Sequence, residues 1–187
     1  GAGYALDADI SSISSNPARL DMLDWQHHVA FDFLPFTSIT KDAKKLGLKY
    51  AYSTGGTSAF SFGLNYYTPG NITLRNDVGA DMQTIKQSDY ALTFGYGMQV
   101  GPNTFLGTSL RYLYQSNLIN LTDNNVISGG AAVGGDIGVL HNFVLTDQLE
   151  RIRLGASIQN IGSKLNGSIY QPMNFSIGAT YSNGFFD

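Results

Sequence analysis

The sequence predicts an all-β fold, an antiparallel transmembrane β-barrel in which residues 1–187 form a single domain. Three features indicate this fold. Bulky apolar residues alternate with small or polar ones over stretches of about ten residues, the length that a tilted strand needs to cross a bilayer. Such stretches recur about eight times, with turn signals between them. The apolar content is strongly aromatic, with 11 Tyr and 11 Phe, whereas only 13% of the residues are charged.

The expected strands follow an irregular opening of about 25 residues. Within the third strand, Phe60, Phe62 and Leu64 alternate with Ala59 and Ser61. Globular strands average only about five or six residues, so the greater length of these stretches favours a membrane barrel. The eight expected strands are 27–36, 44–53, 58–67, 89–100, 104–115, 130–141, 150–160 and 174–182.

Two longer polar connections separate some of these strands. Residues 68–88 are rich in Asn and Asp, and the "NDVG" sequence at 76–79 predicts a turn between two short extended arms. Residues 116–130 form the second connection. We expect both to be external loops.

The orientation of the strands decides between two fold classes. In an outer-membrane barrel the aromatic face meets lipid and the small residues face the lumen. In a soluble β-sandwich, which stays open as an alternative, the aromatic face would pack against a second sheet and the other face would be charged. The non-aromatic faces are mostly Gly, Ala, Ser, Thr and Asn, which favours the barrel.

Composition excludes several classes of function. The formal charge is −3 and the Lys and Arg residues are scattered, so the sequence lacks the basic cluster that is typical of a nucleic-acid-binding surface. Without cysteine there is no thiolate metal site or cysteine nucleophile. His27 and His28 are adjacent, so on a strand they point to opposite faces and cannot share a metal. We expect no metal, no cofactor and no enzymatic activity, since no G-x-S-x-G nucleophile motif is present either.

Charged residues on the small-residue faces are candidate lumen groups. Such charges usually hold a barrel interior together as hydrogen-bonded pairs, and a gating or substrate role is the alternative. The candidates are Asp32, Lys45, Lys49, Arg111, Asp136, Arg151 and Arg153.

The opening segment, residues 1–25, contains "NPA" at Asn16, Pro17 and Ala18. Pro17 lacks a backbone donor and favours an extended Asn16, so the tripeptide predicts a fixed bend. The segment is either a simple turn before the first strand or a plug folded into the lumen.

Several stretches, in order along nearly the whole chain, carry a resemblance to known barrels. These are "SSNPARLDML", "FSFGLNYYTPGNITLRNDVG", "SDYALTFGYG", "GTSLRYLYQSNL", "IRLGASIQNIGSKL" and "PMNFSIGATYS". In them the chain resembles the FadL-like outer-membrane barrels, and within these the PorV family of the type IX secretion system, with the PorQ family second. The resemblance implies that residues 1–25 form an N-terminal hatch and 26–187 the strands. It also implies a larger barrel, of which this chain covers only a part of about eight strands.

The resemblance further implies a non-enzymatic protein of the bacterial outer membrane. It would receive the C-terminal signal domain of secreted cargo from a secretion translocon and pass it to a surface attachment complex. The candidate partner-contact loop is Thr73, Leu74, Arg75, Asn76 and Asp77, which could equally only cap the barrel. The alternative function is a FadL-like channel for hydrophobic small molecules, with Asn16–Ala18 in a movable hatch.

Overall fold

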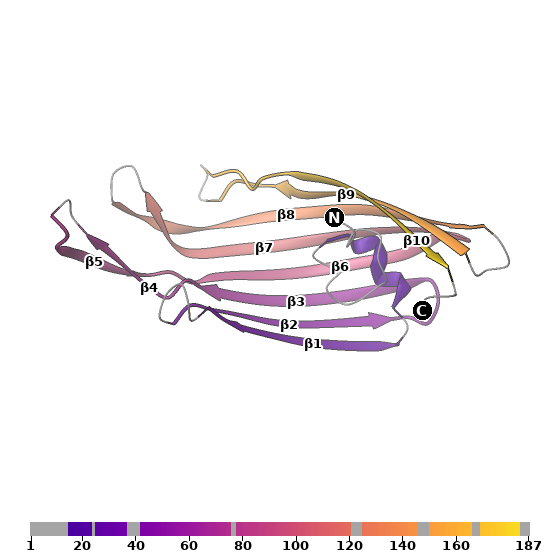
Figure 1. Ribbon diagram of the computed structural model, residues 1–187, viewed down its shortest axis with the longest axis horizontal. Helices are drawn as coiled ribbons and strands as arrows, with labels where there is room; N and C mark the ends of the chain where they lie inside the picture. The colour runs from indigo at the N-terminus through magenta and orange to yellow at the C-terminus, as the bar shows by residue number, and fades with distance from the viewer. Residues whose placement is uncertain are drawn as a thin grey trace.

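The computed structural model describes residues 15–23, 25–36, 42–75, 78–120, 125–145, 150–165 and 169–183. Eight strands form one antiparallel sheet in the order β1-β2-β3-β6-β7-β8-β9-β10 (Figure 1). Their bounds are β1 His27–Pro35, β2 Lys44–Ser53, β3 Ser58–Thr68, β6 Asp89–Gly101, β7 Thr104–Asn120, β8 Asn125–Val144, β9 Glu150–Gly162 and β10 Asn174–Asn183.

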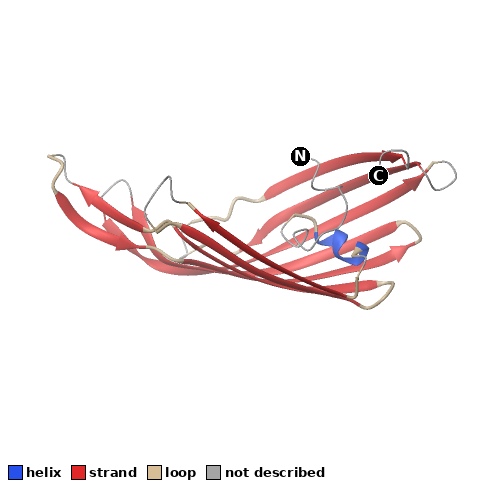
Figure 2. Ribbon diagram, turned by 60° about the horizontal axis from the view of Figure 1, so that its bottom comes forward, coloured by secondary structure: helices blue, strands red, loops and turns tan. Residues whose placement is uncertain are grey.

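This sheet is curved and open. β1 and β10 are its two edges and do not pair with each other. Figure 2 shows the strands arranged as a trough with one helical segment inside it. The predicted all-β class is therefore confirmed, and the unclosed sheet is consistent with part of a barrel wall.

Two strands run further than the sequence predicts. β7 and β8 stay paired from Gln115↔Gly130 through Asn117↔Ser128 to Asn120↔Asn125. The expected strand ends at 115 and 130 are therefore wrong, because residues 116–120 and 125–130 are strand and only residues 121–124 lie outside the described residues. The external position of this connection stays a prediction. Pairing between neighbouring strands overrides the weak alternation in "SNLIN" and "NVISGG".

The other long connection folds as a hairpin of its own. β4 (Asn71–Arg75) pairs with β5 (Asp81–Lys86) as a separate two-stranded sheet. Gly79 has φ 81°, a left-handed conformation that suits the expected turn. The hairpin projects beyond the large sheet (Figure 1), and we call this side of the molecule the hairpin end.

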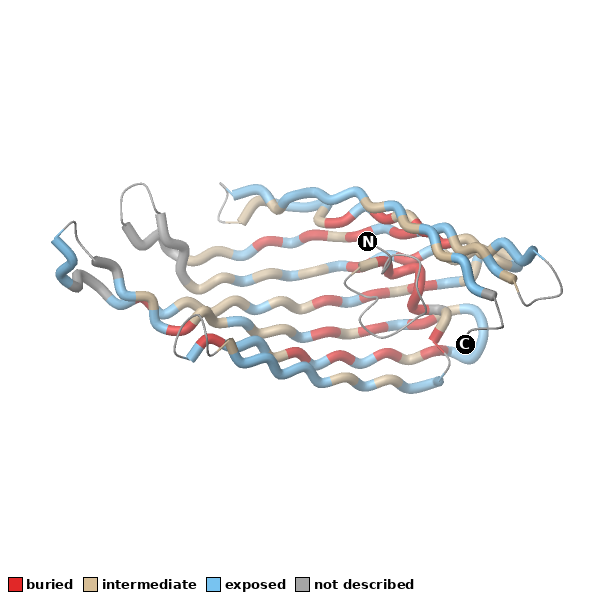
Figure 3. Tube along the Cα trace, viewed as in Figure 1, coloured by how far each residue is buried: buried red, intermediate tan, exposed pale blue. Residues whose placement is uncertain are grey.

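The two faces of the large sheet differ as the alternation predicts. On the convex face, Phe31 is 69% exposed and Phe60 is 52% exposed. On the concave face, Ala51, Ala59 and Ser61 are buried, so buried and exposed residues alternate along the strands (Figure 3). The ring-bearing face is thus uncovered, contrary to what a soluble sandwich would require.

A short 3₁₀ helix, η3 (Pro17–Met22), lies on the concave face and contacts β6, β7 and β8. We call this side of the molecule the helix end. Among the described residues, no helix has the length and apolar character that a membrane-spanning helix requires.

Candidate functional site

The Asn16–Ala18 bend is anchored by hydrogen bonds to the large sheet, which we call the wall. Asn16 is fully buried and caps η3, since its side-chain oxygen accepts from the Ala18 N–H at 3.1 Å. Its Nδ2 donates to the backbone oxygens of Val139, at 3.2 Å, and Ala156, at 3.4 Å. One asparagine side chain therefore both shapes the bend and ties it to β8 and β9.

The wall also reaches the residue before the bend. The Ser15 carbonyl accepts from Ser157 Oγ at 3.2 Å and from Gln159 Nε2 at 2.9 Å. Both donors lie on the concave face of β9, where they are buried. Hydrogen bonds between buried groups of this kind define a single seated position.

Glycines make room for this bend. A Cβ at Gly107 would collide with the Pro17 backbone, and one at Gly138 would collide with Asn16 Oδ1. Only glycine permits such a close approach of β7 and β8 to the segment. We call the recess formed by Gly107 and Gly138 the glycine notch.

Apolar contacts complete the seating. Leu20 and Leu23 form a buried cluster with Ala51 of β2 and Ala59 of β3. The described part of the opening segment, 15–23 without residues 1–14 and 24, thus lies on the concave face rather than continuing as a turn into β1. Its role as a hatch stays a prediction.

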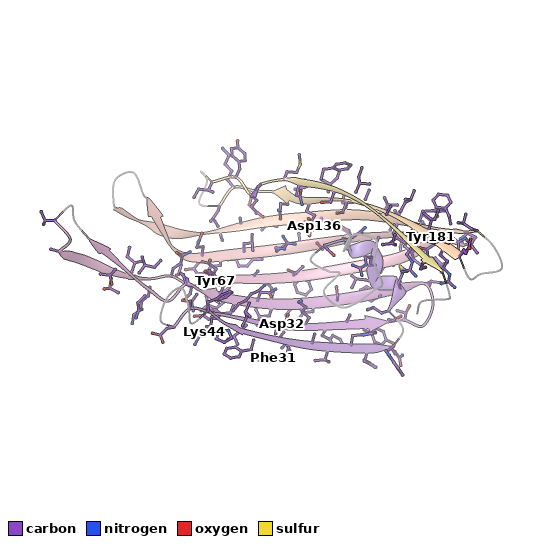
Figure 4. All side chains as sticks on the ribbon, viewed as in Figure 1. Phe31, Asp32, Lys44, Tyr67, Asp136 and Tyr181 are labelled. Atoms are coloured by element: carbon purple, nitrogen blue, oxygen red, sulfur yellow. The ribbon has the colours of Figure 1, made fainter. Side chains whose placement is uncertain are left out.

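Two pairs of candidate lumen charges come together. Lys49 Nζ lies 3.1 Å from Asp32 Oδ2, and Arg111 Nη2 lies 2.8 Å from Asp136 Oδ2. Both pairs are on the concave face. Phe31 and Asp32, neighbours on β1, lie on opposite faces of the sheet (Figure 4).

Asp136 is the centre of a buried network. Its carboxylate accepts from Ser109 Oγ and Arg111 Nη2, and from the backbone N–H of Asn160 at 2.9 Å. Arg111 Nη1 donates to Asn160 Oδ1 at 2.8 Å, which closes the ring of bonds. The pairing of β8 with β9 shifts register here, between Gly135 and Ile137, and Asn160 has φ 61°. The network therefore holds a bulge.

Two of the remaining charged candidates, Lys45 and Arg151, lie at opposite ends of the sheet. Lys45 lies at the hairpin end, and Arg151 lies at the helix end beside Asn103 and Asn142. Neither forms an ion pair with another of the described residues. Arg153 is placed on β9, opposite Asn142 of β8.

The candidate contact residues fall on the projecting hairpin. Thr73, Leu74 and Arg75 belong to β4, and the hydroxyls of Thr73 and Thr84 lie 3.4 Å apart. Asn76 and Asp77 lie outside the described residues.

One feature was missed by sequence reasoning. The β9–β10 connection, read only as a turn, folds back onto the concave face. Asn160 Nδ2 donates to the Pro172 carbonyl at 2.9 Å, and Gln171 Nε2 donates to the Ser163 carbonyl at 3.3 Å. Leu165 and Ile169 pair through their backbones. We call residues 163–165 and 169–173 the inner connection.

The inner connection covers a cavity at the hairpin end. The cavity has a volume of about 310 Å³ and is predominantly apolar. Its lining includes Tyr67, Leu113, Ile169, Tyr170 and Pro172, with Lys45 and Asp89 also present. The long apolar side chains in "SKLNGSIY" were the available signal for a segment with a packing role.

The histidines make ordinary polar contacts. His27 Nδ1 lies 2.9 Å from Tyr50 Oη, and His28 Nε2 lies 2.9 Å from the Trp25 carbonyl. Within the described ranges, no three His, Asp or Glu side chains are grouped as a metal site would require.

The comparisons with known proteins now decide the family. The family model described as "Type IX secretion system protein PorV" matches residues 1–186. The chain belongs to the PorV family. No curated protein sequence matches it. PorV proteins are components of the type IX secretion system, so the hydrogen-bonded segment 15–23, the glycine notch and the hairpin are features of a PorV-family wall.

Proposed function

We propose that this PorV-family chain forms part of an outer-membrane β-barrel that binds the C-terminal signal domain of secreted cargo. It receives cargo from the secretion translocon and passes it to the surface attachment complex. The contact surface is the hairpin end, with Thr73–Arg75 of β4 and the adjoining Asn76 and Asp77.

The observation that carries the membrane part of this proposal is the contrast between the two faces. Large apolar side chains such as Phe31, Phe94 and Ile137 are exposed on the convex face. On the concave face, by contrast, Lys49 and Arg111 are ion-paired. A barrel wall in lipid needs an apolar outer face and tolerates charge only on the lumen side. Outer-membrane lipid is therefore the proposed partner of the convex face.

The choice of the hairpin end follows from the position of η3. The helix end of the trough is occupied by a segment that is hydrogen-bonded to two strands, β8 and β9, through Asn16 and Ser15. At the hairpin end, Asn71 and Thr73 of β4 and Thr84 and Lys86 of β5 are exposed. A β-rich signal domain can recognise such strands by adding to their edges.

The test is binding in the intact protein that contains this chain. Cargo protein with its C-terminal signal domain is added to the protein in lipid nanodiscs, and binding is measured with and without residues 71–86. We expect loss of binding in the shortened protein. Unchanged binding, with a circular dichroism spectrum that still reports folded β-structure, would refute the role of the hairpin.

A second candidate function is supported by the apolar cavity under the inner connection. A FadL-like channel for hydrophobic small molecules needs such a cavity in its lumen. In that case Asn16, Pro17 and Ala18 would belong to a hatch that moves. Mass spectrometry of lipid or detergent retained by the purified protein separates the two functions, because only the channel requires a bound amphiphile.

A further inference from the structure

The cavity at the hairpin end has features of a preformed recognition pocket. Its floor is the concave face, including Tyr67 of β3 and Leu113 of β7, and its cover is the inner connection. Its volume of about 310 Å³ lies at the small end of the ~300–1,000 Å³ range typical of ligand sites. It can therefore hold a small apolar group rather than a large ligand.

The cover is fixed by the buried network around Asp136. Asp136 accepts from the Asn160 N–H, and Asn160 Nδ2 donates in turn to the Pro172 carbonyl. Lys164 Nζ lies 4.2 Å from the centre of the Tyr170 ring, a cation–π contact that restrains this side chain. A pocket whose walls are already ordered loses little entropy on binding.

The charges lining the pocket are unequal. Its two charged lining residues are Lys45 and Asp89, and the Asp89 carboxylate accepts a hydrogen bond from the side-chain amide of Gln87 at 3.2 Å. Lys45 is exposed and has no ion-pair partner among the described residues. An apolar cavity with one unpaired lysine is complementary to an apolar side chain that has a carboxylate beside it.

The pocket also adjoins the proposed contact hairpin. Thr68 Oγ1 at the end of β3 donates to the Gln87 carbonyl at 2.8 Å, which ties the base of the hairpin to the start of β6 and Asp89. A protein bound along β4 and β5 could therefore contact the hairpin and place one of its side chains in the pocket at the same time. Aromatic residues such as Tyr67 and Tyr170 are typical anchors of protein interfaces.

We propose that this pocket is the specificity site for the cargo domain that binds the hairpin. It takes one apolar side chain of that domain, and Lys45 pairs with a carboxylate next to it. This inference rests on the proposed cargo-binding function and adds the residues that select the partner. A free amphiphile in the pocket is the competing occupant.

The experiment uses the intact protein in nanodiscs and purified cargo carrying its signal domain. A photo-crosslinking amino acid is placed at Tyr170 in the pocket, at Thr73 on the hairpin, or at Arg151 at the helix end as a control. We expect cargo crosslinks from Tyr170 and Thr73 but not from Arg151. Crosslinks from Thr73 alone would overturn the pocket and leave the proposed function standing, whereas none from either would overturn both. Equal crosslinking from Arg151 would overturn the pocket as a specific site.

A matched pair of charge variants tests the carboxylate. K45E reverses the charge at the pocket, and K44E reverses a neighbouring charge on the opposite face of β2. We expect K45E to weaken cargo binding about tenfold, because Lys45 is proposed to pair with a carboxylate of the cargo domain. We expect K44E to change cargo binding less than about twofold, because Lys44 lies on the opposite face and makes no such pair. Equal effects of the two variants would overturn the assignment of Lys45.

A third variant, Leu113→Trp, fills the pocket and tests the competing occupant. Mass spectrometry measures the lipid or detergent that the variant retains, and cargo binding is measured alongside. Loss of the retained amphiphile with unchanged cargo binding would assign the pocket to the amphiphile instead.

Discussion

The backbone N–H of Asn160 on β9 donates a hydrogen bond to Asp136 Oδ1 on β8 at 2.9 Å. This bond lies where the pairing of β8 with β9 shifts register, and it stabilises the bulge there. The same carboxylate pairs with Arg111, and the Asp136 side chain is only 1% exposed. A single buried charge thus supports the bulge, the ion pair and the inner connection. Burying such a charge is favourable only when every partner is present.

Removal of the Asp136 carboxylate should therefore be costly. Asp136→Ala leaves the Arg111 guanidinium without its counter-charge, and we expect the free energy of unfolding to fall by about 3–5 kcal/mol. Urea unfolding of the protein in lipid vesicles measures this change. The comparison variant is Asp32→Ala, because the Asp32 carboxylate is half exposed, whereas that of Asp136 is buried. Water already hydrates and screens the Asp32 carboxylate in the folded protein, so we expect a smaller loss than in Asp136→Ala. Equal losses in the two variants would contradict the central role of Asp136.

Alternation in the sequence was enough to predict the strands and their faces. Phe31 and Phe60 fall on one face and Ala59 and Ser61 on the other, because the side-chain period of a strand fixes the face of every residue. Arg111 and Asp136 could be named as candidates for the concave face. Their pairing could not, since it depends on the register of β7 against β8.

Three features that depend on tertiary contacts could not be predicted from the sequence. The glycine notch is one, because Gly107 and Gly138 are two of 22 glycines and only the seated segment distinguishes them. The inner connection is another, because its position depends on the Asn160–Pro172 bond. The extension of β7 and β8 is a third, where pairing across Asn117↔Ser128 replaces an expected loop.

The glycine notch predicts how the opening segment can be released. Gly138→Ala places a methyl group against Asn16 Oδ1, so we expect η3 to leave the wall more often. Arg19 is buried, and trypsin should cut after it about tenfold faster in the variant, since proteolysis follows the open population. Gly101→Ala is the control, because the nearest atom to its Cβ would be Thr104 Oγ1 at 3.8 Å. Unchanged cleavage in Gly138→Ala would mean that the notch does not hold the segment.

If the convex face meets lipid, an arginine placed on it should destabilise the fold more at the middle of the bilayer than near its surface. Leu110 is exposed midway along this face, and Leu110→Arg should lower the free energy of unfolding in lipid vesicles by about 2–4 kcal/mol. Tyr181 lies near the end of β10, where Tyr181→Arg should cost no more than about 1 kcal/mol. Urea titration of both variants gives the difference. A neutral Leu110→Arg variant would show that the convex face does not meet hydrocarbon.

The single tryptophan offers a test that needs no substitution in the wall. Trp25 is 74% exposed and precedes β1 at the helix end. Because amphipathic rings collect at the boundary between water and hydrocarbon, we expect its fluorescence to be quenched most by lipids brominated close to the head group. Lipids brominated near the end of the acyl chain should quench it least, and Trp25→Phe should abolish the signal in a chain that has no other tryptophan. Strongest quenching by the deepest bromines, or none at any depth, would contradict the placement of the helix end at the membrane surface.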